Sequence, residues 1–581
     1  MSTTLNIGLL VNEERLSKYE HDLVGWANSS GTVRISHLIV QQRDPPPRKR
    51  ALLIRLLRLP PGKLLGALLW KIKARMEARH LAAVDAYRDF GRSFEVGDRI
   101  PGRIYVKPRV SKSGLVYRFS EEDLEKIRRE RFDILIRCGS GILRGGILQS
   151  ARLGVLSFHH GDNRVNRGGP PGFWEVYHGS SRTGFVVQRL TEELDGGDVL
   201  LRGFVPTQAN HLLNCALLFG KSYFYLRSLL ERIAATGELP PAEPHVPYSG
   251  RLYVAPRARE VAAYLSKRAG RTIVGHIRHS LSRTERWGVC FLKSDWPSAA
   301  FWRGTRISTP RGRFLADPFV ATLNGLSCVF VEDYVYSTAK GHITAFEIGQ
   351  SGAQELGTAL NEKFHLSFPF LFEHRGALFM CPESIGAEQI RIYRCSRFPL
   401  EWTLECVAMN GVSAADTMLF PHGDRWWLFT NLSQTEPLEA SSELHIFSAP
   451  DPISNSWAPH PRNPVLIDPA CARNAGLLRD ANGIVRVCQS QGFGSYGASA
   501  SLMRVTRLDT EAYAEERICQ LTPEFLPGAH GTHHLHSNGI YSVWDYKRWE
   551  RIPSTSSRAS AGQRRSNATY AASVDATRPS G

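Results

Sequence analysis

The feature that most constrains the fold of this 581-residue chain is a repeat that begins near residue 316. Each copy has a polar or small residue, a short apolar strand, a turn with Gly or Asn, and a second apolar strand. The copies start at intervals of roughly 50 to 60 residues, the length of one four-stranded propeller blade. A β-sandwich is the alternative, but a sandwich does not require similar units. The five copies are ADPFVATLNGLSCVFVED, SFPFLFEHRGALFMCPES, ADTMLFPHGDRWWLFTN, NAGLLRDANGIVRVCQS and THHLHSNGIYSVWDY.

The residues before the repeat have the pattern of an α/β domain. LNIGLLVN near the start and FDILIRCG further along are apolar runs of strand length, separated by helix-like stretches. No GxGxxG turn follows the first strand, so no dinucleotide is expected. The predicted organisation is an α/β domain at 1–240, a linker and connecting helix at 241–285, an all-β five-bladed propeller at 286–550, and a disordered tail at 551–581.

The formal net charge of +17 is concentrated in two segments. Residues 43–79 contain eleven Lys and Arg against Asp44 and Glu77, a net +9. Residues 551–581 contain five Arg against one Asp, a net +4. Because the rest of the chain is close to balanced, it offers no broad phosphate-binding face, and no nucleic-acid partner is expected.

The basic segment 43–79 mixes leucines with arginines and lysines, and Pro60 and Pro61 divide it into two short amphipathic pieces. Apolar area combined with basic charge favours docking on an anionic membrane surface. The alternative is a pair of helices packed on the protein with basic outer faces. The sequence leaves both interpretations open.

The ten cysteines show no CxxC pair or metal-type spacing, so no metal site is expected. The start of the chain lacks the pattern of a secretory signal, and no apolar run approaches the roughly 20 residues that span a bilayer. These features predict a cytoplasmic protein, peripheral at the inner membrane face if the basic segment binds lipid.

Residues 154–198 carry the densest set of chemically useful side chains. A strand ending in Phe158 leads into a loop with His159, His160, Asn163 and Arg167. This loop has too many histidines, glycines and prolines to be helical, and α/β proteins place their chemistry in such loops. A second strand then ends near Asp195, so we expect a histidine and a carboxylate at the same edge of one sheet.

Residues 132–200 resemble the formyltransferase family, which includes the methionyl-tRNA, glycinamide ribonucleotide and nucleotide-sugar formyltransferases. The resemblance implies a Rossmann-like fold, 10-formyltetrahydrofolate as the formyl donor, and an amine as the acceptor. The matching residues are Ser157, His159, Arg167, Gly168, Pro171, Thr183, Gly184, Leu194, Asp195, Gly197 and Asp198.

The resemblance also assigns roles to individual residues. His159 would donate to the oxyanion or relay the amine proton, and Asp195 would orient the imidazole. The turn GSGILRGGIL resembles the family's pterin-binding loop. The predicted cofactor-binding residues are Gly139, Ile142, Leu143, Arg167 and Gly168.

Ser157 departs from the family pattern, which has asparagine at this position. Loss of one oxyanion donor typically costs on the order of 100 to 1,000-fold in rate. Asn163 and His160 are the candidates to replace it. Three outcomes stay open: an active site with altered geometry, a site for another acyl transfer, and a degenerate site.

The repeat region resembles the five-bladed propellers of glycoside hydrolases that act on furanosides and fructans. It is also similar to the N-terminal propeller of plant glucosamine inositolphosphorylceramide transferases. Asp317, followed by Pro318, matches the first carboxylate of the hydrolases, and Glu332, Glu383 and Asp416 occupy comparable blade positions. These acids would bind sugar hydroxyls or cleave a glycoside.

Two functional hypotheses follow. The first is formyl transfer to the amine of a nucleotide-linked or lipid-linked amino sugar in glycan biosynthesis. The second is a glycan-binding or glycan-processing propeller protein whose formyltransferase-like domain has lost its activity.

Overall fold

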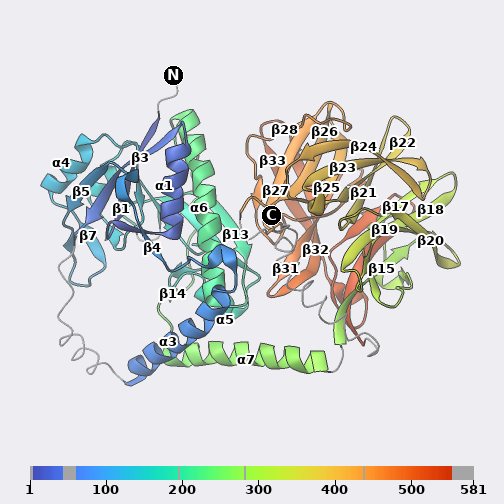
Figure 1. Cartoon of the computed structure of the whole chain (residues 1–581), viewed down its shortest axis with the longest axis horizontal. Coiled ribbons are helices and arrows are strands. Elements are labelled where there is room, and N and C mark those ends of the chain that lie inside the picture. Colours follow the sequence, from blue (N-terminus) through green and yellow to red (C-terminus); the bar gives the residue numbers. More distant parts are fainter. Residues whose placement is uncertain (1–3, 43–60, 194–195, 281–282, 436–438, 552–581) are drawn as a thin grey trace. The chain divides into compact units, whose positions relative to one another are not determined.

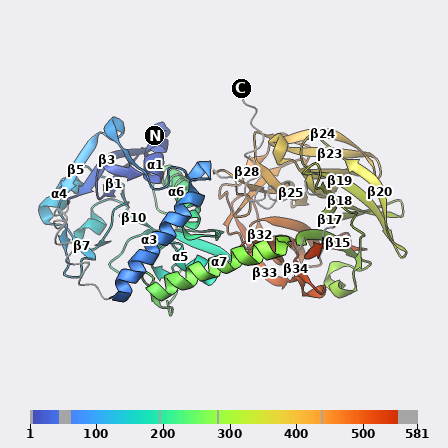
Figure 2. The same ribbon diagram turned by 60° about the horizontal axis from the view of Figure 1, so that its bottom comes forward.

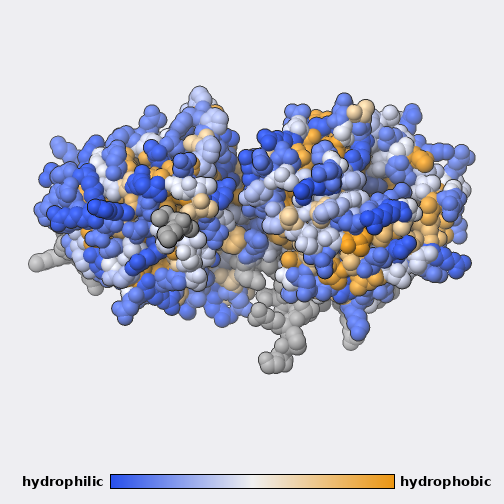
Figure 3. Space-filling model, turned by 90° about the horizontal axis from the view of Figure 1, so that it is seen from above, coloured by the Kyte–Doolittle hydropathy of each residue, from blue (hydrophilic) through white to orange (hydrophobic). Residues whose placement is uncertain are grey.

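The computed structural model describes residues 4–42, 61–193, 196–280, 283–435 and 439–551. The chain forms two compact units, Met1–Gly270 (unit 1) and Arg271–Gly581 (unit 2), which are seen in Figure 1. On the face drawn in Figure 3, both units are covered mainly by hydrophilic residues. The predicted Asp195, the first half of the basic segment (43–60) and the predicted tail from 552 onward lie outside the described residues.

Unit 1 is built on a seven-stranded sheet with the strand order β13-β12-β10-β8-β1-β3-β5. The five strands from β10 to β5 are parallel, whereas β12 and β13 pair antiparallel at one edge. Strand order runs outward from β1 in both directions, so the order reverses between β1 and β8. In open α/β sheets, ligands bind beside the carboxyl ends of the strands at such a reversal. The strands are β1 (Leu5–Val11), β3 (Val33–Gln41), β5 (Gly102–Val106), β8 (Ile134–Arg137), β10 (Val155–His159), β12 (Arg182–Arg189) and β13 (Asp198–Pro206).

Helices cover both faces of this sheet. Leu23 of α1 (Lys18–Ser29) and Leu226 of α6 (His211–Thr236) pack with alternate residues of β1 and β3 on one face. Leu124 and Ile127 of α4 (Glu121–Arg129) pack on the other face. Ser120 is the N-cap of α4, and its side chain accepts a hydrogen bond from the Asp123 amide at 3.3 Å. Parallel strands covered on both faces explain why their sequences are nearly continuous apolar runs.

Unit 2 contains five antiparallel sheets among its described residues. Four of them each begin with one of the first four repeats, and the fifth combines β15 and β16 (Thr305–Arg306) with the last repeat. The first sheet contains β17 (Arg313–Leu323), β18 (Leu326–Val335), β19 (Lys340–Gly349) and β20 (Gly352–Leu360), and the second contains β21 (Ser367–His374), β22 (Ala377–Glu383), β23 (Gln389–Arg397) and β24 (Glu401–Asn410). The third contains β25 (Ala414–His422), β26 (Arg425–Leu432), β27 (Glu443–Ala449) and β28 (Ala458–Pro459), and the fourth contains β30 (Asn474–Asp480), β31 (Gly483–Gly492), β32 (Ser495–Leu508) and β33 (Tyr513–Leu521). The principal strands of the fifth are β15 (Arg283–Leu292), β34 (Ala529–Gly531), β35 (Leu535–Ser537) and β36 (Ser542–Arg551).

The first repeat strands of successive sheets contact one another. Strand β17 contacts β21, β21 contacts β25, β25 contacts β30, β30 contacts β35, and β35 contacts β17. The ring is closed by the pairing of β15 with β36, which continues from Arg283↔Arg551 to Leu292↔Ser542. Unit 2 is therefore propeller-like, and the strands nearest its centre come from the starts of the repeats.

The second half of the basic segment forms α3 (Pro61–Leu81), which lies at the surface of unit 1 (Figure 2). Among the described residues, none of the helices combines the length and the apolar character needed to cross a bilayer.

Candidate functional site

In unit 1, the candidate site lies at the carboxyl ends of the parallel strands. Ser157 and His159 lie in the last three residues of β10. Because side chains alternate between the two faces of a strand, these two point to the same face. Ser157 is directly opposite Arg137 of β8 and Gln188 of β12. Side chains opposite one another in neighbouring strands share a face. Arg137, Ser157 and Gln188 thus form a row across the sheet, next to His159.

His159 is oriented by the loop that follows it. Its Nε2 lies 2.8 Å from the carbonyl oxygen of Asn166. A carbonyl only accepts, so Nε2 carries a proton and, in the neutral ring, Nδ1 is the acceptor. Asn166 in turn donates from Nδ2 to Oε1 of Glu175 in α5 (Phe173–His178) at 3.0 Å. Burial raises the pKa of Glu175, and the bond from Asn166 opposes that rise.

Ser157 is paired with a cation. Arg137 donates from Nη1 to Ser157 Oγ at 3.1 Å and from Nε to the Gly141 carbonyl at 3.0 Å. The Ser157 hydroxyl itself donates to the Phe158 carbonyl at 3.2 Å. Beside Ser157, the strand edge therefore carries a guanidinium, which was not predicted from the sequence. The only sequence signal for it was a basic residue ending the apolar strand FDILIRCG.

Neither predicted substitute for the missing amide lies in this row. His160 is on the opposite face of β10, where its ring stacks on Phe158 and its Nε2 is 3.1 Å from Ser222 Oγ. Burial, helped by the neighbouring His159, lowers the pKa of His160 to about 3, so its ring is neutral. The Asn163 side chain accepts a hydrogen bond from Arg202 at 3.0 Å.

The predicted cofactor loop also lies at this edge of the sheet. The amide of Gly139 donates to the Leu10 carbonyl at 2.8 Å, and a Cβ at Gly139 would lie 2.4 Å from Nε2 of Gln41. Ile142 and Leu143 form the short strand β9, and Leu143 is buried in the core. Gln41 is fully buried at the end of β3, and among the described atoms its amide oxygen and nitrogen have no hydrogen-bond partner. A side chain at position 139 would therefore clash with the buried Gln41 amide, and cofactor binding by Gly139, Ile142 and Leu143 remains a prediction.

Arg167 and Gly168, also predicted to bind the cofactor, form β11, which pairs with β14 (Leu252–Tyr253). The Arg167 guanidinium lies 4.7 Å from the centre of the Tyr248 ring. Gly168 has φ 100°, and a Cβ there would lie 2.0 Å from the Tyr253 carbonyl oxygen. The loop backbone thus requires glycine at this position, and cofactor binding by both residues remains a prediction.

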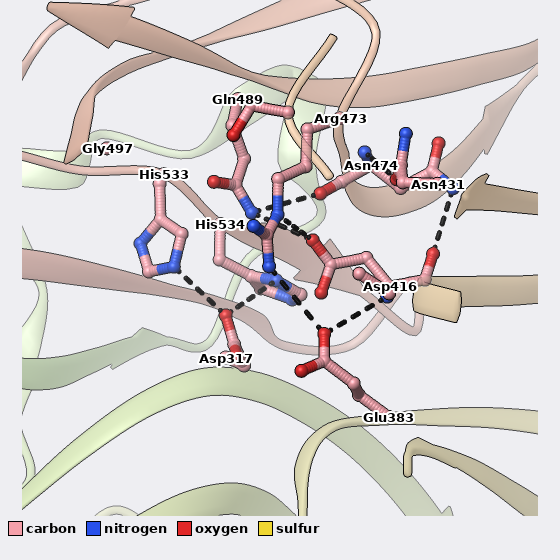
Figure 4. Close-up of polar contacts among 12 residues, drawn as sticks. Asp317, Glu383, Asp416, Asn431, Arg473, Asn474, Gln489, Gly497, His533 and His534 are labelled. Carbon is pink, nitrogen blue, oxygen red and sulfur yellow. Dashed lines mark hydrogen bonds and ion pairs between the residues drawn. The ribbon is translucent and has the colours of Figure 1, made fainter. Parts of the chain in front are cut away.

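In unit 2, a second polar cluster lies among the strands nearest the centre, as Figure 4 shows. Asp317 and Asp416 occupy equivalent β-bulges in β17 and β25, with φ values of 48° and 47°. A bulge inserts an extra residue and re-aims its side chain. In Figure 4 the side chains of Asp317, Asp416 and Glu383 point toward one another.

Arg473 contacts two of these acids. Its Nε is 2.6 Å from Asp416 Oδ2, and its Nη2 is 3.6 Å from Glu383 Oε2. Gln489 also donates to Asp416 Oδ2 at 3.0 Å. Burial and the charge of Asp416 raise the pKa of Glu383 to about 8, although Arg473 opposes this. At neutral pH, Glu383 is therefore mainly a protonated acid next to an ionised Asp416–Arg473 pair.

A histidine links the remaining acids. His533 lies between Asp317 Oδ1, 3.1 Å from its Nε2, and Asp545 Oδ2, 2.7 Å from its Nδ1. Burial disfavours the imidazolium, but Asp545 and Asp317 outweigh it and raise the pKa of His533 to about 10. Asp317, His533 and Asp545 have the proximity of metal ligands. In its protonated state, His533 forms an ion pair with each of the two carboxylates.

Glu332, the fourth predicted acid, is buried with Oε1 3.4 Å from His365 Nε2. Burial, followed by the charges of Asp317 and Glu383, raises its pKa. All four predicted acids therefore belong to one electrostatic cluster. Arg473 and His533 were not predicted from the sequence. Arg473 directly precedes the fourth repeat, and His533 is the second residue of the fifth, so their positions at the repeat starts could have indicated them.

Comparison with known proteins gives two kinds of match. The family model "Glucosamine inositolphosphorylceramide transferase 1, N-terminal" matches residues 295–528. Glucosamine inositolphosphorylceramide transferase 1 of Oryza sativa subsp. japonica is 34% identical over 206 residues, which are 35% of this chain and 27% of that protein. The chain thus spans about a quarter of the length of this relative.

The second kind of match is to a formyltransferase. Methionyl-tRNA formyltransferase of Listeria monocytogenes serovar 1/2a is 24% identical over 226 residues, covering 36% of this chain and 69% of that protein.

Among solved structures, the family 117 glycoside hydrolase Zg3597 of Zobellia galactanivorans has a TM-score of 0.31 and 10% identity, covering 46% of this chain and 91% of that one. The resemblances to formyltransferases and to glucosamine inositolphosphorylceramide transferases predicted from the sequence are confirmed.

The protonation of His533 predicts a pH-dependent stability of unit 2. The unfolded imidazole has a pKa of about 6.5, whereas the folded value is about 10. The stabilisation is therefore complete below about pH 6.5 and is lost as the pH rises toward 10. The raised pKa of Glu383 acts in the same direction up to about pH 8. We expect the free energy of unfolding to fall over this range, measured by urea unfolding of the whole chain with hydrogen exchange to identify the unit 2 transition.

His533→Gln should flatten this pH dependence, because a neutral amide takes the place of the titrating ring. The exposed His422 provides the matched control, and His422→Gln should retain the wild-type slope. An unchanged slope in His533→Gln would contradict the assignment.

Arg473 predicts a large stability effect. Arg473→Met leaves the buried Asp416 without its cation, and breaking a buried pair costs about 3–5 kcal/mol. Adding Asp416→Asn should recover part of this loss in urea unfolding. Arg397, whose side chain is 81% exposed, is the control, and Arg397→Met should cost no more than about 0.5 kcal/mol.

Proposed function

We propose that unit 1 transfers a formyl group from 10-formyltetrahydrofolate to the amine of an amino sugar. The observation that carries this proposal is the pairing of Arg137 with Ser157 beside His159, at the carboxyl ends of β8 and β10. This pairing puts a permanent cation where the family's amide donor is missing. The similarity to methionyl-tRNA formyltransferase supports the reaction class.

The reaction makes two demands that these residues meet. When an amine attacks a formyl carbon, negative charge develops on the formyl oxygen and the nitrogen becomes positive. Arg137 would hold the negative charge by donating from its guanidinium. His159 would accept the amine proton at Nδ1, since its Nε2 already donates a hydrogen bond to the Asn166 carbonyl. The folate supplies the formyl carbon, and its nitrogen leaves with the proton that the amine gives up.

The donor would lie in the loop from Gly139 to Leu143. Arg167 and Gly168 would form the neighbouring wall. The loop predicted to contain Asp195 follows β12, and its Gly197 lies against Gln188 of the same row. Asp195 would balance the charge on His159 during proton transfer.

An amino sugar is the acceptor that best suits the whole chain. We infer that the five sheets of unit 2 are the blades of one propeller whose central cluster binds the sugar. Its paired acids, amides and guanidinium can exchange hydrogen bonds with hydroxyl groups. The relatives named glucosamine inositolphosphorylceramide transferase support a glucosamine-type sugar. A tRNA acceptor fits poorly, because most of the excess positive charge is concentrated in two segments.

The test is incubation with 10-formyltetrahydrofolate and a panel of nucleotide-linked and lipid-linked amino sugars, with the formamide product detected by mass spectrometry. Wild-type protein should form product with at least one acceptor. Arg137→Leu should reduce kcat by roughly 100 to 1,000-fold through the lost oxyanion donor. His159→Ala should reduce kcat by about 100-fold or more through the lost base.

Arg129→Leu is the matched control, since Arg129 is exposed in α4 away from the sheet edge. Full activity in Arg137→Leu would show that Ser157 acts without it. Absence of formamide product with every acceptor, both in the wild type and in Ser157→Asn, would refute formyl transfer.

The second candidate function is glycan binding by unit 2 with an inactive unit 1. It is favoured by the central cluster, in which Asp317 and Asp416 are each held by an internal cation. Asp317→Ala should weaken binding of amino-sugar glycans at least tenfold by calorimetry, whereas the exposed Asp509→Ala should not. Binding that survives Asp317→Ala would reject this second function. Glycan binding without folate binding or formyl product would select it over the first.

A further inference from the structure

Helix α3 (Pro61–Leu81) has its polarity inverted relative to an ordinary surface helix. Its fully buried long side chains are Lys73 and Glu77, both with no exposed surface. Five of its large apolar side chains instead point to solvent, with exposures from 37% for Leu64 to 56% for Leu68, whereas Leu69 and Trp70 are half-buried and Leu81 is buried. An ordinary surface helix buries its apolar stripe against the core. The exposed apolar residues of α3 are Leu64, Leu65, Leu68, Ile72 and Met76.

The buried face fixes this orientation. Lys73 Nζ is 3.0 Å from Glu77 Oε2 and lies 4.2 Å from the centre of the Trp70 ring. Glu77 accepts further hydrogen bonds from the Tyr264 hydroxyl and from the Leu212 amide. Rolling the helix to bury its leucines would expose or unpair these charges, and breaking a buried pair is strongly destabilising. The apolar stripe is therefore held outward by unit 1 itself.

The outward face is also strongly basic. Lys63, Lys71, Arg75 and Arg79 are all exposed. Glu77 is the only acidic residue of α3 and is buried, so no acid of the helix offsets this charge at the surface. The stripe at 65, 68, 72 and 76 has the spacing of one helical face. Apolar area bordered by lysine and arginine is the composition of helices that lie in a membrane interface.

We propose that the outward face of α3 docks unit 1 on an anionic membrane surface. The leucines, Ile72 and Met76 would enter the boundary between headgroups and acyl chains, while the basic side chains would contact anionic headgroups. Charge favours lipid over another protein surface, because the patch has no acids with which to specify a partner. The preceding residues 43–60, outside the described part, add six Lys and Arg against one Asp. The proposal is independent of the formyl-transfer assignment.

Vesicle sedimentation of the full chain tests this. Wild-type protein should pellet with vesicles of equal parts phosphatidylcholine and phosphatidylserine, and not with phosphatidylcholine alone. Added salt should weaken the binding by screening. The double variant Lys71→Glu/Arg75→Glu and the triple variant Leu65→Ser/Leu68→Ser/Ile72→Ser should each lower the partition coefficient by about tenfold or more.

Matched controls come from exposed residues of unit 2. Lys293→Glu/Lys363→Glu changes charge equally, and Leu323→Ser/Leu404→Ser/Ile518→Ser removes equally exposed apolar side chains. Both controls should bind as wild type, and all variants should keep the wild-type unfolding transition. Formylation of a water-soluble acceptor, where it occurs, should be unaffected by the α3 variants.

Three outcomes would overturn the proposal. One is failure of the wild type to bind anionic vesicles, and another is equal binding to neutral vesicles. The third is self-association of the wild type that the triple variant abolishes without any vesicle binding, which would identify the stripe as an interface between copies of this chain.

Discussion

A charge that is removed from water has to be paired, and this constraint governs the polar arrangement of both units. In unit 2, Asp416 is held by Arg473 and Asp317 by the imidazolium of His533. In unit 1, Lys73 is paired with Glu77. Each pair fixes the orientation of the helix or strand that carries it, because another orientation would leave a buried charge unpaired. The pairs at the centre of unit 2 determine what the site presents to a ligand, and the pair beneath α3 determines which side of that helix faces solvent.

Much of the architecture follows from the sequence, because periodic apolar runs and turn residues act locally. The repeats mark the strands nearest the centre of unit 2, and the predicted strand before the active-site loop is β10, which ends at His159, one residue later than predicted. What escaped prediction depends on register between distant strands. Arg137 joins Ser157 only because β8 and β10 are neighbours with that alignment. Likewise, the membrane and packed-helix interpretations of 43–79 were alternatives, yet α3 is packed and keeps an apolar stripe outward. Periodicity alone could not reveal that a charged pair occupies the buried face.

The two candidate sites use ionisable groups in different ways. The edge in unit 1 combines a fixed cation, Arg137, with a histidine whose tautomer is set by the Asn166 carbonyl. Such a site can take up a proton and hold a negative charge at separate atoms, as acyl transfer to an amine requires. At the centre of unit 2, the acids are paired with cations of the protein itself. That arrangement suits recognition of neutral hydroxyl-rich groups, which exchange hydrogen bonds without altering the charge balance.

The pairing of β15 with β36 also affects how the chain folds during its synthesis. These strands open and close the folded part of unit 2, and every intervening sheet lies between them in the chain. During synthesis β15 can pair with the nearby β16, but its longer pairing with β36 must wait until nearly the whole of unit 2 has left the ribosome, whereas unit 1 can fold as soon as its own strands emerge. Contacts of such long sequence separation form slowly. The nascent chain therefore carries a finished α/β unit followed by open, unpaired sheet edges, and this interval is when it most needs protection from aggregation.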